Sequence, residues 1–264
     1  MNGSTSGSGP LGRRSTGVTS PGHPVEVPHT AVPRWSERFG VVAGITERGG
    51  GPVPFDLGLA GDAPVGTVLD RWRALQAETG ARSVVVSRQV HGCRVSWHQD
   101  LPAGLSVQDG SDGHASRTPG LLLAVTVADC LPVYLVDPVA RAIALLHAGW
   151  RGTAGGILAA GIACLRERAG SRVPDVAMHV GPGICGACYQ VGAEVPAALG
   201  VASEGVGPFH VDLREVLVEQ AGRLGVGEVS TSQLCSSELR NRFFSHRASG
   251  GRDGRMVAYL ALRP

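Results

Sequence analysis

The chain of 264 residues is 43% hydrophobic, which is enough apolar material for a large buried core in a single domain. Its formal net charge of +2, without a basic run interleaved with aromatic residues, argues against nucleic acid as a partner. The sequence contains neither an apolar stretch of about 18 residues that could cross a membrane nor the apolar core of a secretory signal, so we expect a cytoplasmic protein.

The first part of the chain, residues 1–33, is rich in Gly, Ser, Pro and Thr and has almost no periodic apolar content. Such a composition buries too little apolar surface to offset the conformational entropy that is lost on folding. A disordered or cloning-derived tail is therefore predicted. Residues 34–264 are expected to form one domain.

From Phe39 onward the sequence has the apolar runs that the first part of the chain lacks. Val41–Ile45 is a predicted strand, and the glycine-rich loop that follows it presents Arg48. Apolar residues at helical spacing predict a helix over Pro64–Thr79, and the β-branched run Val84–Val86 predicts another strand.

The centre of the fold is expected in two almost continuous apolar runs, Leu121–Ala128 and Ala140–Leu146. With Asp137-Pro138 as the linker, they are predicted to form a strand pair that is buried on both faces.

The second half of the chain mixes helices with strands. Thr153 is the predicted cap of a helix that reaches about Arg168, and Asp212 is the predicted cap of a second helix. Val176–Val180 and Met256–Leu262 are predicted strands. The combination favours a single α/β domain.

Three metal-ligand side chains stand close to predicted strand ends. His91 follows the run at 84–86, Cys130 follows the first central run and His147 follows the second. Two imidazoles and one thiolate would leave one coordination position open, which is typical of catalytic rather than structural zinc. Against this stands the simpler interpretation that each is an ordinary buried or hydrogen-bonded group.

A second interpretation treats Cys130 as a nucleophile without a metal, with His147 or His91 lowering its pKa. Asp129, next to the cysteine, is a candidate general base or a partner that orients a histidine. Because neighbouring side chains on a strand point to opposite faces, a purely structural carboxylate is the alternative for Asp129.

The chain has six cysteines, which we expect to be thiols or ligands rather than disulfides in a reducing compartment. Cys185 and Cys188 form a Cys-x-x-Cys motif. A structural zinc site there is disfavoured because the sequence shows no second paired motif.

Three motifs carry a resemblance to a known family: Gln89–Gly92, Ala128–Val133 and His147–Gly152. Further segments agree in order, namely Gly181–Ile184, Cys188–Gly192, Asp212-Leu213, Phe243–Arg247 and Gly254–Met256. From about Phe39 to Leu262 the chain resembles the YfiH family, which is also called the laccase-domain or polyphenol-oxidase-like family.

The resemblance implies one α/β domain with mixed sheets layered between helices. It implies zinc, with copper as an alternative, on His91, Cys130 and His147. The implied activity is phosphorolysis of adenosine, inosine and methylthioadenosine, with deamination of adenosine as a second reaction. Arg48, as a catalytic and substrate-binding residue, and Arg151 are then expected to supply positive charge for phosphate, with Asp129 near the substrate.

The chain also departs from the family pattern, because Asp56 replaces the usual asparagine. A carboxylate there loses two hydrogen-bond donors and adds a charge near the predicted phosphate site. Purine nucleosides and phosphate are the expected small-molecule partners, and a monomer is favoured over an oligomer.

Three other functions are kept as alternatives. A copper-dependent, laccase-like polyphenol oxidase is disfavoured because the nine histidines include no His-x-His pair. A cysteine or metal hydrolase acting on a cell-wall precursor amide is compatible with the resemblance. A non-enzymatic binding module would instead need a closed zinc site with four protein ligands.

Overall fold

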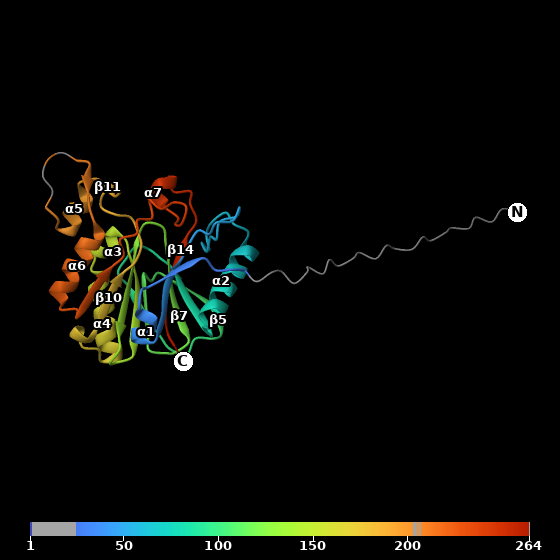
Figure 1. The fold of residues 1–264 in the computed structure, drawn as a ribbon, viewed down its shortest axis with the longest axis horizontal. Coiled ribbons are helices and arrows are strands. Elements are labelled where there is room, and N and C mark those ends of the chain that lie inside the picture. Colours follow the sequence, from blue (N-terminus) through green and yellow to red (C-terminus); the bar gives the residue numbers. More distant parts are fainter. Residues whose placement is uncertain (2–24, 203–204, 206, 264) are drawn as a thin grey trace.

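The computed structural model describes residues 1, 25–202, 205 and 207–263 (Figure 1). Within these residues, two large β-sheets carry most of the strands. In spatial order, the first sheet consists of β1 (His29–Ala31), β2 (Val41–Thr46), β14 (Met256–Leu262), β7 (Leu121–Val127), β3 (Ser83–Arg88) and β5 (Gly104–Asp109). The second consists of β13 (Glu228–Thr231), β10 (Ala177–Val180), β8 (Leu131–Asp137), β9 (Ala142–Ala148), β6 (Gly113–Ser116) and β4 (Val95–His98).

The remaining elements are short, apart from three longer helices. A small sheet pairs β11 (Gln190–Val191) with β12 (Phe209–His210). The helices are α1 (Trp35–Phe39), α2 (Val65–Thr79), α3 (Trp150–Ala154), α4 (Ile157–Ala169), the 3-10 helix η1 (Val173–Asp175), α5 (Glu194–Leu199), α6 (Leu213–Leu224) and α7 (His246–Ser249).

The two large sheets pack against each other through one apolar core. Leu123 of the first sheet and Leu145 of the second belong to it, together with the fully buried Tyr134. The Tyr134 hydroxyl donates a hydrogen bond to the Gly44 carbonyl at 2.8 Å, so this polar group is satisfied across the two sheets.

Helices cover the outer face of each sheet, on opposite sides of the molecule (Figure 1). On the first sheet, Trp72 and Leu75 of α2 are buried against strand residues such as Leu122. On the second, α4 and α6 bury Leu158 and Leu217. The result is four layers, helix, sheet, sheet and helix, as expected for an α/β domain with layered mixed sheets. Because both sheets are covered on both faces, their central strands β7, β8 and β9 are almost continuous apolar runs.

The predicted central strand pair was wrong in its partners. β7 and β9 lie in different sheets, and β9 pairs instead with β8, which the prediction had left in the connection. Periodicity shows that a run is buried, but it does not reveal which sheet the run joins.

The predicted helix from Thr153 is divided into α3 and α4. Gly156 adopts a left-handed conformation with φ 85° between them, and Thr153 lies inside α3 rather than capping the long helix. Asp212 does cap α6, where its carboxylate accepts a hydrogen bond from the Arg214 backbone N–H at 2.8 Å.

The boundary predicted at residue 33 was too late. Residues 2–24 of the predicted tail lie outside the described residues, but His29–Ala31 forms β1 and pairs with β2. The helices in the described ranges are all too short or too polar to span a membrane.

Candidate metal centre and active site

The structure brings the three predicted ligands together from distant parts of the sequence. His91 follows β3, Cys130 directly precedes β8, and His147 lies near the end of β9. One ligand atom from each lies within 4.8 Å of the others. The two imidazole rings meet edge to face, with centroids 4.9 Å apart. The donor set of two imidazoles and one thiolate fits Zn²⁺ or copper.

The site is buried on one side and open on the other. His147 is only 3% exposed and Cys130 is partly buried, whereas His91 is exposed. Gly149 lies against the ligands, since a Cβ there would stand 3.0 Å from the Cys130 Sγ and 3.3 Å from the His91 Cδ2. The absence of a side chain at Gly149 therefore keeps space beside the ligands.

Asp112, just before β6, organises the two histidines and was missed in the sequence. Its Oδ1 accepts hydrogen bonds from the His147 Nδ1 and the His91 backbone N–H, both at 2.9 Å. Its Oδ2 accepts from the backbone N–H groups of Val90 (3.1 Å) and Gly92 (2.8 Å). Because Nδ1 of His147 is occupied, Nε2 is the nitrogen left for a metal. The Asp-Gly pair at 112–113 resembles an ordinary turn, which hides this role.

The same contacts set the charge of the site. Burial would raise the pKa of Cys130, but the charge and hydrogen bonds of His147 and His91 outweigh it and lower the pKa from 9.0 to about 6. Burial would lower the pKa of His147, but Cys130 and Asp112 raise it to about 9. Without a metal, the thiolate therefore faces an imidazolium, and metal binding must release a proton.

Asp129 has a structural position. Its backbone is left-handed (φ 84°), its Oδ1 accepts the Ser236 hydroxyl at 2.6 Å, and its Oδ2 accepts the Arg247 backbone N–H at 2.6 Å. Both carboxylate oxygens are thus engaged in joining the chain before Cys130 to two later loops. These contacts favour the structural alternative over a general base.

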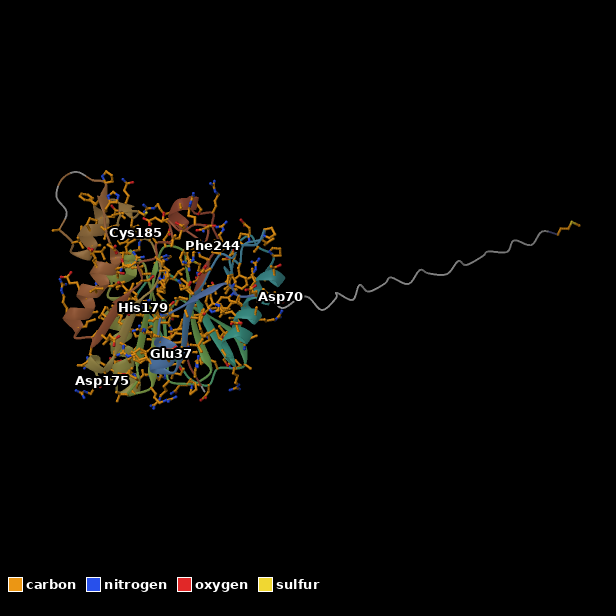
Figure 2. All side chains as sticks on the ribbon, in the orientation of Figure 1. Glu37, Asp70, Asp175, His179, Cys185 and Phe244 are labelled. Atoms are coloured by element: carbon orange, nitrogen blue, oxygen red, sulfur yellow. The ribbon has the colours of Figure 1, made fainter. Side chains whose placement is uncertain are left out.

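Arg48 lies at the edge of a polar pocket of about 400 Å³. Its guanidinium pairs with Asp253 at 2.7 Å and stacks over the Phe244 ring at 4.9 Å, and its side chain is 31% exposed. In Figure 2, Phe244 and Cys185 lie toward the same end of the molecule, opposite Asp175. Asp253 already balances the Arg48 charge, so a phosphate would have to compete with this carboxylate.

Two exposed arginines, Arg151 and Arg247, act electrostatically on Tyr189, as Cys130 does. Burial raises the pKa of the Tyr189 hydroxyl to about 12; the charge of Cys130 adds to the rise, while Arg247 and Arg151 oppose it. Arg247 stacks over Tyr189 at 5.2 Å, and Arg151 over Trp150 at 4.3 Å. Arg247 and Tyr189 fall inside the segments that carried the family resemblance, but their residue types alone gave no functional signal.

The fold and the cluster together define a class: a layered α/β domain with an open site of two histidines and one cysteine. Comparison with known families gives a match over residues 43–263 to the family described as "Multi-copper polyphenol oxidoreductase laccase". The chain belongs to this family, and the predicted YfiH-type assignment is confirmed.

Three similar proteins illustrate the range of the family. The chain is 35% identical to the purine nucleoside phosphorylase of Deinococcus radiodurans over 260 residues, covering 93% of this chain and 95% of the relative. It is 33% identical to adenosine deaminase RL5 of an unknown prokaryotic organism, covering 69% and 76%. The crystal structure of the hypothetical protein YfiH of Bacillus licheniformis matches with a TM-score of 0.82 at 27% identity, covering 90% and 97%.

Proposed function

We propose that this chain is a metal-dependent purine nucleoside enzyme. It would cleave adenosine, inosine and methylthioadenosine with phosphate, releasing the free base and either ribose 1-phosphate or, from methylthioadenosine, methylthioribose 1-phosphate, and it would deaminate adenosine. The observation that carries the proposal is the convergence of His91, Cys130 and His147 within 4.8 Å at an open site. Support also comes from relatives that are named purine nucleoside phosphorylase and adenosine deaminase.

The metal would be held by His91, Cys130 and His147, and zinc is the proposed ion. When bound, it would supply a Lewis acid and lower the pKa of a water molecule. Asp112 fixes the ring of His147 and the backbone of His91, so the ligands are positioned before the ion arrives.

Positive charge around Tyr189, which also feels the charge of Cys130, favours phosphate as the second substrate. In phosphorolysis a phosphate oxygen attacks C1′ of the ribose and the bond to the purine nitrogen breaks, so a polyanion must be held next to the sugar. Arg151 and Arg247 are exposed and both act electrostatically on Tyr189. We assign phosphate to these two arginines and the purine ring to a stacking contact with Tyr189. The role predicted for Arg48 stays a prediction.

A copper-dependent phenol oxidase is the second candidate, and the family description favours it. Among the described residues, however, a single candidate metal group contains histidine. A multicopper oxidase needs several histidine-rich copper sites, so the ligands present suit one metal ion in this part of the fold.

The proposal is tested with zinc-loaded protein and adenosine, inosine or methylthioadenosine, with and without phosphate. Free base and the sugar 1-phosphate (ribose 1-phosphate or, from methylthioadenosine, methylthioribose 1-phosphate) are measured by chromatography, and inosine formed from adenosine reports deamination. We expect phosphate-dependent release of base. No release by the wild-type protein under these conditions would refute the phosphorylase assignment, and phenol oxidation by copper-loaded protein alone would favour the second candidate.

Cys130→Ala should abolish both nucleoside reactions, because it removes the thiolate ligand. Cys164→Ala is the matched control: Cys164 lies on α4 and belongs to neither candidate metal group. It should keep wild-type activity. Undiminished base release by Cys130→Ala would argue against metal dependence at this site.

A further inference from the structure

A second group of metal-ligand side chains lies outside the candidate active site. It consists of Cys185, Cys188, Cys235 and Glu238, and one ligand atom from each lies within 4.8 Å of the others. The Cys185 and Cys188 Sγ atoms each lie 3.5 Å from the same Glu238 oxygen, Oε1. The Cys-x-x-Cys motif, disfavoured as a zinc site for want of partners, therefore has two partners 47 or more residues further along the chain.

The two loops that carry these ligands are joined by backbone contacts. Gly183 and Cys235 form an isolated parallel β-bridge. The Ser236 N–H donates to the Gly183 carbonyl at 3.0 Å, and the Cys185 N–H donates to the Cys235 Sγ at 3.3 Å. The loops are thus held in register beside the sulfur atoms.

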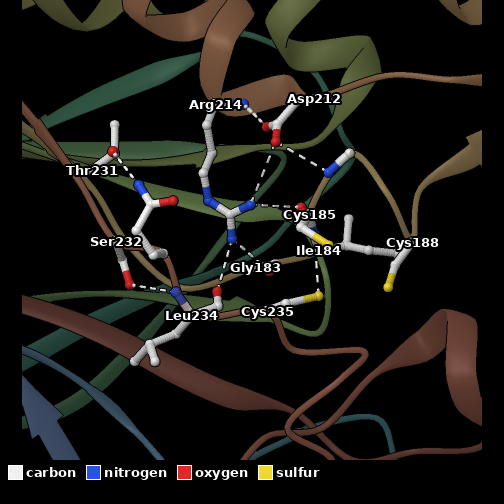
Figure 3. Close-up of polar contacts among 12 residues, drawn as sticks. Gly183, Ile184, Cys185, Cys188, Asp212, Arg214, Thr231, Ser232, Leu234 and Cys235 are labelled. Atoms are coloured by element: carbon white, nitrogen blue, oxygen red, sulfur yellow. Dashed lines mark hydrogen bonds and ion pairs between the residues drawn. The ribbon is translucent and has the colours of Figure 1, made fainter.

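A buried arginine, Arg214, donates hydrogen bonds to both loops (Figure 3). The guanidinium of Arg214 donates to the carbonyls of Gly183 (2.8 Å) and Ile184 (3.2 Å) in one loop and Leu234 (2.8 Å) in the other. Each of these residues is next to, or two positions from, a cysteine of the group. Because this guanidinium binds three carbonyls, it holds both loops in place and thereby positions the cysteine ligands.

We propose that Cys185, Cys188, Cys235 and Glu238 bind a structural zinc ion. Three thiolates and one carboxylate supply four ligands, which closes a tetrahedral site and leaves no position for substrate. Thiolates select zinc or Cu(I) over hard cations, and the carboxylate favours zinc over Cu(I).

The position of the site gives it a consequence for the candidate active site. Ser236, next to Cys235, donates its hydroxyl to Asp129, next to Cys130. The Ile184 N–H donates to the Asp129 carbonyl at 2.9 Å. Both loops of the structural site therefore contact Asp129, the residue before Cys130. The ion would stabilise the position of this part of the candidate active site.

Metal counting tests the proposal without reference to catalysis. Protein produced with added ZnCl₂ is dialysed against metal-free buffer with a mild reductant. The number of zinc ions per chain is then measured by inductively coupled plasma mass spectrometry. We expect two zinc ions per chain in the wild type, and one in both His91→Ala/Cys130→Ala and Cys185→Ser/Cys188→Ser. Cys164→Ser should keep two.

One zinc ion in the wild type together with none in His91→Ala/Cys130→Ala would overturn the proposal. So would two ions in Cys185→Ser/Cys188→Ser. If the latter variant fails to fold, the count in His91→Ala/Cys130→Ala decides, because that variant leaves the structural cluster intact. A wild-type protein that binds two zinc ions but has no nucleoside activity would contradict the proposed function and leave the structural zinc site standing.

Cobalt reports the ligands directly. With CoCl₂ in place of zinc, His91→Ala/Cys130→Ala should show a strong sulfur-to-cobalt absorption from three thiolates, and Cys185→Ser/Cys188→Ser a weaker one from a single thiolate. A disulfide within the cluster is the competing state. Alkylation of the denatured, unreduced protein that leaves Cys185 or Cys188 unmodified would identify it and overturn the zinc assignment.

Discussion

Asp112 and His147 form a buried pair in which the carboxylate Oδ1 accepts a hydrogen bond from the imidazole Nδ1 at 2.9 Å. The carboxylate is 0% exposed and also accepts three backbone N–H groups from Val90, His91 and Gly92. One side chain therefore sets the orientation of one proposed ligand and the backbone of the other. Such partners of metal ligands control affinity although they never touch the ion.

Replacing Asp112 by asparagine should weaken metal binding about 10- to 100-fold. An amide presents an NH₂ group to at least one set of donors, so some of the four hydrogen bonds must be lost. Zinc affinity is measured by competition with a chromophoric chelator. Asp137→Asn is the control, because Asp137 is also buried but caps the turn at the other end of β8 through the N–H groups of Val139 and Ala140. Equal affinity in the Asp112→Asn and wild-type proteins would remove Asp112 from the site.

The sequence predicted the proposed ligands because each lies at or near the end of a strongly apolar strand, and such strands are recognisable from composition alone. His91, Cys130 and His147 could be named before their distances were known, and so could β14 and α2. Asp112 could not, since its partners are mainly backbone N–H groups of a loop about 20 residues earlier. A backbone N–H looks the same at every position in a sequence.

The proposed structural zinc site was disfavoured in the sequence for a related reason. Cys185 and Cys188 are close in sequence, but their partner Cys235 is a single cysteine 47 residues beyond Cys188, outside any paired motif. Only the bridge between Gly183 and Cys235 brings it to the pair. The division of strands between two sheets was likewise hidden, because β7, β8 and β9 are all buried on both faces and have no periodicity that distinguishes one sheet from the other.

Gly149→Ala should impair the metal centre without disturbing the fold elsewhere. The added Cβ would lie 3.0 Å from the Cys130 Sγ and 3.3 Å from the His91 Cδ2, so one ligand must move. A shift of a few tenths of an ångström in a ligand lowers metal affinity, and we expect a loss of about tenfold or more. Zinc retention after dialysis measures it.

Gly222→Ala provides the comparison for that substitution. Gly222 lies within α6, and a Cβ there meets nothing within 4 Å. Replacing a helical glycine by alanine should raise stability by about 0.5–1 kcal/mol and leave zinc binding unchanged. If Gly149→Ala also retains full zinc, the room beside the ligands is not needed for binding.

Arg247→Ala should raise the KM for phosphate by about 10- to 100-fold, which corresponds to the loss of one charge-assisted contact. The Asp129 contact should persist, because it uses the backbone N–H of Arg247. Arg48→Ala should have a smaller effect, since Asp253 already pairs with that guanidinium. Arg172→Ala serves as the control, because Arg172 is an exposed arginine directly before η1; its KM for phosphate should stay at the wild-type value. An unchanged KM in Arg247→Ala, with an increase in Arg48→Ala, would transfer the phosphate role to Arg48.

Stability should fall as the pH is lowered from 7 to 5, in part because of a buried histidine pair. His98 and His114 are hydrogen-bonded at 2.8 Å, and burial lowers the pKa of His98 from 6.5 to about 4 and that of His114 to about 3. Both are neutral in the folded protein at pH 5, whereas the same imidazoles are largely protonated in the unfolded chain. Since the unfolded state binds more protons below pH 6.5, acid favours unfolding until the pH reaches the folded pKa values.

The contribution of His98 between pH 7 and pH 5 is on the order of 1–2 kcal/mol. His98→Gln keeps a hydrogen-bonding side chain but cannot be protonated, so its free energy of unfolding should fall less steeply over this range. Urea unfolding at several pH values measures the slope, and His210→Gln, at an exposed histidine of β12, should keep the wild-type slope. A His98→Gln slope as steep as that of the wild type would mean that the acid sensitivity arises from other groups, such as His179, whose pKa burial lowers from 6.5 to about 4.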